Sequence, residues 1–257
     1  MINQTQTMPN LNYARAAGAA YLGVVLFGGF AEFFVRMQLH VSGDITQTVS
    51  NIRSSEFLFR MGLLADLSML FLDVLLALFL FKLFKDVNWE LSVLALVLSL
   101  LRVPLLAANL SNHYEVLQIL NNVDYLALFE TEQINAMATL ALEKHQKGYL
   151  IAQMLFGTWC FTVGILVYAS NFIPRFLGVL MMLAGFGYLT DLVMSILFPT
   201  SLSPIPDILL TESAFAEISL CLWLLLMGGR VQIRALAEAR SKAERRASIY
   251  TSEREVM

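Results

Sequence analysis

The sequence has little charge and almost no cysteine. Only 14% of its 257 residues are charged and 58% are hydrophobic, whereas soluble domains carry about 25% charge. The two cysteines, Cys160 and Cys221, exclude a disulfide framework. The net charge of -3 gives no basic footprint for nucleic acid. The composition excludes a disordered chain and a soluble enzyme, and it indicates a protein whose solvent is the lipid bilayer.

Familiar catalytic motifs are also missing from the sequence. It contains no zinc-binding HExxH, no phosphate-binding GxxxxGK[ST] and no serine elbow GxSxG. The three histidines, His40, His113 and His145, all map to the predicted outside surface, and no two of them are three or four residues apart. We therefore expect no metal and no cofactor, and the sequence does not establish whether these histidines approach one another.

Long apolar runs are the main feature that is present. Six stretches are long enough to cross a bilayer, at about 20 residues each; they cover residues 16–36, 57–82, 91–114, 148–169, 175–198 and 208–228. These runs are apolar all round, which is typical of buried or lipid-facing helices. The sequence predicts an all-α polytopic protein with a six-helix transmembrane domain over residues 16–228.

The Lys and Arg residues predict the orientation, because basic loops stay in the cytoplasm. If both termini are cytoplasmic, 11 basic residues lie inside and four outside, with Arg60 and Arg102 within spans. We expect a multi-pass membrane protein with a cytoplasmic N-terminal segment 1–15 and a basic cytoplasmic tail over 229–257 that forms a C-terminal helix. Helical spacing of apolar residues from Ile134 to Leu142 also predicts an amphipathic helix over the outer face.

Charged residues inside the spans carry the functional signal. A charge at the bilayer centre costs about 2.5–3.5 kcal/mol even on a lenient scale. Asp66 and Asp73 share one face of the second span, and Arg102 lies near the midplane of the third. We expect Arg102 to bridge the two aspartates, either as a ligand anchor or as an ion pair that only specifies packing.

The other buried charges do not balance. Six acids face three arginines in or near the spans; the acids are Glu32, Asp66, Asp73, Asp191, Glu212 and Glu217, and the arginines are Arg36, Arg60 and Arg102. Either several carboxyls are protonated or the outer half holds a wet, acid-lined cavity. Asn109, Asn112 and His113 continue the Arg102 face outward, where they line such a cavity or face headgroup water.

Three segments of the sequence resemble a known family. They are GDITQTVSNIRSSEFLFRMGLLADLSMLFLDVLLALFLFKLFKDVN, LLRVPLLAANL and PRFLGVLMMLAGFGYLTD. Together they resemble the bacterial membrane family named domain of unknown function 4386, over most of residues 16–198. The resemblance rests on Asp44, Thr48, Asn51, Arg60, Asp66, Asp73, Arg102, Asn109, Pro174 and Arg175. It implies a bacterial multi-pass membrane protein, which we expect in the inner membrane, and no particular activity.

The functional hypothesis is a ligand site in an outer-facing cavity. The ligand is small and polar or amphipathic. The hypothesis has two forms: the protein only binds this ligand, or it binds the ligand and also transfers it. The predicted ligand-binding residues are Arg60, Asp66, Asp73, Arg102, Asn109, His113 and Asp191. Two alternatives stay open: an intramembrane enzyme that acts on lipid through buried carboxylates, and a structural or assembly partner. The sequence predicts the bilayer as partner and leaves the oligomeric state undetermined.

Overall fold

The computed structural model describes residues 12–121, 128–198 and 210–228, and every long element in these ranges is a helix. The first span is composite, running from α1 (Asn12–Gly29) through a π-helix, η1 (Phe30–Arg36), into the short α2 (Met37–Leu39). The short α3 (Ile45–Ser54) leads into α4 (Glu56–Phe84), which is followed by α5 (Trp89–Leu120). The chain continues with α6 (Thr131–Ala169), α7 (Arg175–Leu197) and a last helix over Leu210–Gly228.

Six of these helical segments are long and apolar enough to cross a membrane. Each contains all or nearly all of one predicted span, so the expected all-α six-span architecture is confirmed. Many large apolar side chains on their outer faces are exposed, Phe34, Phe57 and Phe71 among them. Such a surface suits lipid, since a bilayer offers apolar side chains an apolar surrounding.

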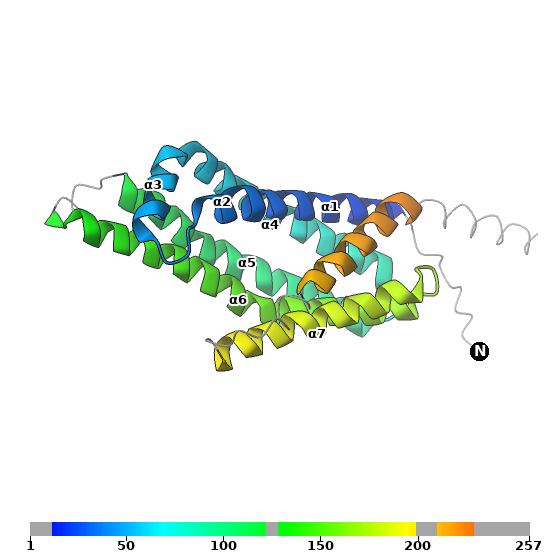
Figure 1. Ribbon diagram of the computed structural model, residues 1–257. Coiled ribbons are helices and arrows are strands. Elements are labelled where there is room, and N and C mark those ends of the chain that lie inside the picture. The colour runs from blue at the N-terminus through cyan, green and yellow to red at the C-terminus, as the bar shows by residue number, and fades with distance from the viewer. Residues whose placement is uncertain (1–11, 122–127, 199–209, 229–257) are drawn as a thin grey trace, which may run out of the picture.

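Helix α6 differs from the expected arrangement. The predicted amphipathic helix exists, but it is the first half of one continuous helix with the fourth span and not a separate element. Its 39 residues correspond to about 58 Å, roughly twice the hydrocarbon thickness. A capping box between Glu130 and Gln133 begins the helix. The helix is therefore longer than one bilayer crossing requires, and its first turns lie beside α2 and α3 (Figure 1).

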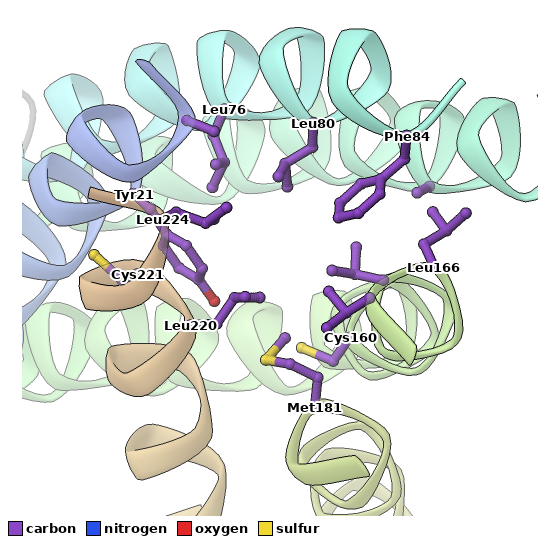
Figure 2. Packing of buried hydrophobic residues seen from close by; sticks show 14 of the residues in the cluster. Tyr21, Leu76, Leu80, Phe84, Cys160, Leu166, Met181, Leu220, Cys221 and Leu224 are labelled. Carbon is purple, nitrogen blue, oxygen red and sulfur yellow. The ribbon is translucent and has the colours of Figure 1, made fainter. Parts of the chain in front are cut away.

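The two ends of the bundle are built differently. Helices α2 and α3 and the start of α6 lie together at one end, which we call the α3 end (Figure 1). The opposite end holds the largest apolar cluster. Figure 2 shows Leu76, Leu80 and Phe84 of α4 facing Leu166 of α6 and Met181 of α7 across this cluster.

Small residues set the closest helix contacts. In α6, Gly164 lies against the carbonyl oxygen of Gly178 in α7, where an added Cβ would be 2.7 Å from that oxygen. Two turns earlier in α6, Gly157 packs in the same way against the carbonyl oxygen of Gly185 in α7. Glycines at these positions let the backbones of two neighbouring helices approach closely. The predicted C-terminal tail 229–257 lies outside the described residues, as do residues 1–11 of the N-terminal segment.

Candidate functional site

A buried polar group lies between η1, α4, α5 and α6, toward the α3 end. Its centre is formed by Asp66, His113 and His145, one residue from each of α4, α5 and α6. All three side chains are buried, and their potential ligand atoms all lie within 4.8 Å of one another. The fold thus brings together three residues that are 32 or more positions apart in the sequence.

Arg36 is the charge partner of Asp66. Its Nη1 donates to Asp66 Oδ2 at 2.7 Å, and its Nε donates to Glu32 at 2.7 Å. The hydroxyl of Tyr149 donates to the other carboxylate oxygen, Oδ1, at 3.3 Å. Asp66 is fully buried, so this cation and this hydroxyl supply the stabilisation that a buried carboxylate requires.

The π-helix and one glycine explain how Arg36 reaches Asp66. The first span has π-helical turns over residues 30–36, which are wider than α-helical turns, and such segments often occur at functional sites. In α4, Gly62 packs directly against Val35, where an added Cβ would lie 2.8 Å from Cγ1 of Val35. This close approach, one helical turn before Asp66, brings the neighbouring arginine to the carboxylate.

His145 is held in a defined orientation by Asn109. The Asn109 side-chain amide donates to the backbone carbonyl oxygen of His145 at 2.8 Å. The backbone carbonyl oxygen of Asn109 lies 3.2 Å from His145 Nδ1 and can accept its proton. In that tautomer Nε2 keeps its lone pair, and among the described residues Nε2 has no hydrogen-bond partner.

His113 is fully buried without a hydrogen bond. Neither ring nitrogen has a hydrogen-bond partner within the described part of the chain, and Nδ1 is 4.0 Å from Asp66 Oδ2. The ring packs edge-on against Phe59 and His145, at centroid distances of 4.1 and 5.0 Å. Burying a polar group without a hydrogen-bond partner costs about 1–3 kcal/mol of stability. His113 is therefore a buried side chain whose two ring nitrogens could bind a ligand.

A cavity of about 20 Å³ adjoins these histidines. It is lined by Arg36, Leu39, His40, Ile52, Phe59, His113, Leu142, His145 and Gln146. All three histidines of the chain line it, and Nδ1 of His40 is also buried without a hydrogen-bond partner in the described ranges. The volume is sufficient for one water molecule or one ion.

Two of the predicted polar residues and one predicted arginine have different surroundings. Asn109 and His113 are buried, which agrees with the cavity alternative and not with the headgroup alternative. Arg60 lies at the start of α4, where its side chain is 46% exposed and pairs with Glu56 at the surface. It lines no route to the cavity, because residue 60 falls on the outward face of the helix.

Arg102 forms a second group with Asp73. Its Nη2 donates to Asp73 Oδ2 at 2.5 Å, and the guanidinium carbon lies 4.2 Å from the ring centroid of Phe156. The predicted buried ion pair is therefore confirmed for Asp73. The expected bridge to Asp66 is wrong, because the first span supplies Arg36 to that carboxylate instead.

Two further acidic side chains form hydrogen bonds with uncharged side chains. Asp191 accepts a hydrogen bond of 2.7 Å from Gln153 of α6. Glu217, in the last helix, accepts hydrogen bonds from the hydroxyls of Tyr21 at 3.0 Å and Tyr188 at 2.5 Å. Asp191 and Glu217 are therefore met by an amide and two tyrosines, whereas both carboxylate oxygens of Glu212 are buried without a hydrogen-bond partner among the described residues.

Comparison with known proteins gives one family. The family model described as "Domain of unknown function (DUF4386)" matches residues 16–228. The chain belongs to this family. No curated protein and no solved structure matches it. Together with the six spanning helices, the DUF4386 match identifies a multi-pass integral membrane protein.

Proposed function

We propose that this DUF4386 protein binds a small polar ligand in the cavity at the α3 end, and that its buried polar residues are arranged for this binding. The observation that carries the proposal is the fully buried His113, whose ring nitrogens have no hydrogen-bond partner among the described residues and adjoin a cavity. A bound polar group would recover the stabilisation that this side chain lost on leaving water.

The size and lining of the cavity define the ligand. A space of about 20 Å³ accepts a ligand of roughly one water molecule or one ion, or a small polar part of a larger molecule. Of the predicted ligand residues, His113 lines the cavity, while Asp66 and Asn109 support its lining residues through Arg36 and His145. Arg102, Asp73 and Asp191 belong to separate polar groups.

The proposal concerns binding rather than transfer across the membrane. A large apolar cluster packs around the C-terminal part of α4, far from α3, and Figure 2 shows part of this cluster. The distribution of Lys and Arg favours an outside position for the α3 end. We therefore propose a site that opens outward in a bacterial inner membrane, with both termini in the cytoplasm.

Blocking the cavity tests this function. Purified protein in detergent would be heated with Zn²⁺, Mg²⁺, inorganic phosphate, acetate or ethanolamine, since a ligand that binds only the folded state raises the unfolding temperature. Leu142→Phe fills the cavity from α6. Leu140→Phe adds the same volume on the exposed side of that helix and serves as the control.

At least one compound should stabilise the wild type and Leu140→Phe but not Leu142→Phe. A second blocking variant, Ile52→Phe on α3, checks that the loss does not come from misfolding of α6. Stabilisation that survives in both correctly folded blocking variants, or that no compound produces in the wild type, would contradict the proposal.

A further inference from the structure

We propose that Asp66, His113 and His145 form a binding site for one divalent transition-metal ion of the zinc class. This inference names the ligand of the cavity and so rests on the proposed function. It departs from the sequence expectation of no metal, because that expectation depended on sequence spacing, whereas these ligands come from three different helices.

The donor set matches the coordination chemistry of zinc. Two imidazoles and one carboxylate are three protein ligands, and open zinc sites combine three such ligands with a water molecule. The cavity beside His113 and His145 has room for that water. Mg²⁺ and Ca²⁺ prefer oxygen ligands, so the imidazoles favour a first-row transition metal.

The supporting hydrogen bonds match those of a metal site. A metal-binding histidine usually donates its other ring nitrogen to a carbonyl or carboxylate, which fixes the free lone pair on the metal side. His145 has this arrangement, with Nδ1 beside the Asn109 carbonyl oxygen and Nε2 free of hydrogen bonds from the described residues. Arg36 and Tyr149 orient the carboxylate of Asp66, whose oxygens have further lone pairs for a metal.

The distances require only a small contraction. Ligand atoms around a tetrahedral zinc lie about 3.4 Å apart, given metal–ligand bonds of about 2.0–2.2 Å. The three side chains offer ligand atoms within 4.8 Å of one another. The side chains must therefore approach one another by up to about 1.4 Å, and no hydrogen bond to a described residue holds the His113 ring.

The charge of the surroundings also suits a cation. Arg36 is positive, but it contacts two carboxylates, Glu32 and Asp66. The local group therefore has one negative charge in excess before a metal binds. The cavity lining includes the half-buried His40 and the exposed Gln146, so part of the cavity wall reaches the surface.

The test uses the full-length protein, purified in detergent without a histidine tag and stripped of metal with a chelator. Zn²⁺ binding is measured by titration calorimetry, and the visible absorption of added Co²⁺ reports the coordination geometry. The ligand variants are Asp66→Asn, His113→Gln and His145→Gln. Asp191→Asn is the matched control, since it changes a hydrogen-bonded acid within a span but outside the proposed site.

We expect one Zn²⁺ per chain and a tetrahedral Co²⁺ spectrum in the wild type and in Asp191→Asn. Each ligand variant should lose at least about tenfold in affinity, the lower limit for disturbing even a supporting residue of a metal site. Absence of stoichiometric Zn²⁺ in the wild type, or unchanged affinity in all three ligand variants, would overturn the inference.

A second measurement covers the case in which the ligand variants do not fold. X-ray absorption of the wild-type protein with Zn²⁺ should show at least two imidazole ligands, and fewer than two overturns the inference. If Zn²⁺ fails to bind but phosphate or acetate stabilises the wild type and not Leu142→Phe, the metal inference fails alone. If no compound stabilises the wild type, the proposed function fails with it.

Discussion

Arg36 and Asp66 form a buried ion pair of 2.7 Å that joins the π-helical part of the first span to α4. Removing only the cation, as in Arg36→Met, leaves the fully buried Asp66 carboxylate without its charge partner. Such a loss typically costs about 3–5 kcal/mol of stability. We expect that decrease in the free energy of unfolding, measured by denaturant titration in detergent.

The double variant Arg36→Met with Asp66→Leu provides the control for this pair. Replacing both partners by apolar residues is often close to neutral, so the double variant should recover most of the lost stability. If it is as unstable as Arg36→Met alone, the pair does not account for the effect of the arginine.

The Arg102 and Asp73 pair should behave as a packing element. Arg102→Met leaves Asp73 buried beside Phe156 and is expected to lower the free energy of unfolding by a similar 3–5 kcal/mol. Because Arg102 does not line the cavity, the variant should keep the ligand-induced rise in unfolding temperature seen in the wild type. Loss of that rise in folded Arg102→Met protein would instead place Arg102 in the ligand site.

Much of the fold could be predicted from the sequence, because length and hydropathy alone determine which segments can cross a bilayer. The pairing of Arg102 with Asp73 was also predictable, since a short turn makes α4 and α5 antiparallel neighbours. The partner of Asp66 was not, because Arg36 reaches it through a π-helical turn and a close approach at Gly62. Neither feature has a clear sequence signature.

His145 and Tyr149 were missed for a related reason. The sequence placed residues 115–147 in an outer segment, so His145 seemed to lie outside the bundle. In the structure α6 continues without interruption from Thr131 to Ala169 and carries both side chains into the buried group. The available signal was the helical spacing of apolar residues before residue 148, which continues in phase into the fourth span.

Asn109 should matter for both stability and metal affinity. Asn109→Leu removes the side-chain donor to the His145 carbonyl oxygen and leaves a buried acceptor without that bond, which costs about 1–3 kcal/mol. His145 then loses part of its orientation, and Zn²⁺ affinity should fall about 10–100-fold. Asn112→Leu is the neighbouring control, because Asn112 contacts Asn109 and not His145; an equal loss in both variants would contradict a role in orienting the histidine.

The orientation in the membrane can be tested by labelling single cysteines. Cys160 and Cys221 are buried, so new surface cysteines should dominate the reaction with a membrane-impermeant maleimide. In intact bacterial cells Ser42→Cys, at the α3 end, should be labelled, whereas Asp86→Cys, between α4 and α5, should react only after lysis. The reverse pattern would place the α3 end and the proposed site in the cytoplasm.

The glycine contacts between α6 and α7 should be sensitive to added volume. Gly164→Val would bring side-chain atoms into the carbonyl of Gly178 and the backbone of Met182, both already in close contact. Overpacking of this kind costs about 1–3 kcal/mol of stability and forces the helices apart.

Gly29→Ala is the control for Gly164→Val, because the nearest neighbour of Gly29 is the side chain of Phe33, at an ordinary contact distance of 3.7 Å. Since His145, the proposed metal ligand on α6, lies about five turns away, Gly164→Val should lower the unfolding temperature and leave Zn²⁺ stoichiometry at one per chain. Equal stability of the two variants would show that the close approach of α6 and α7 contributes little to the fold.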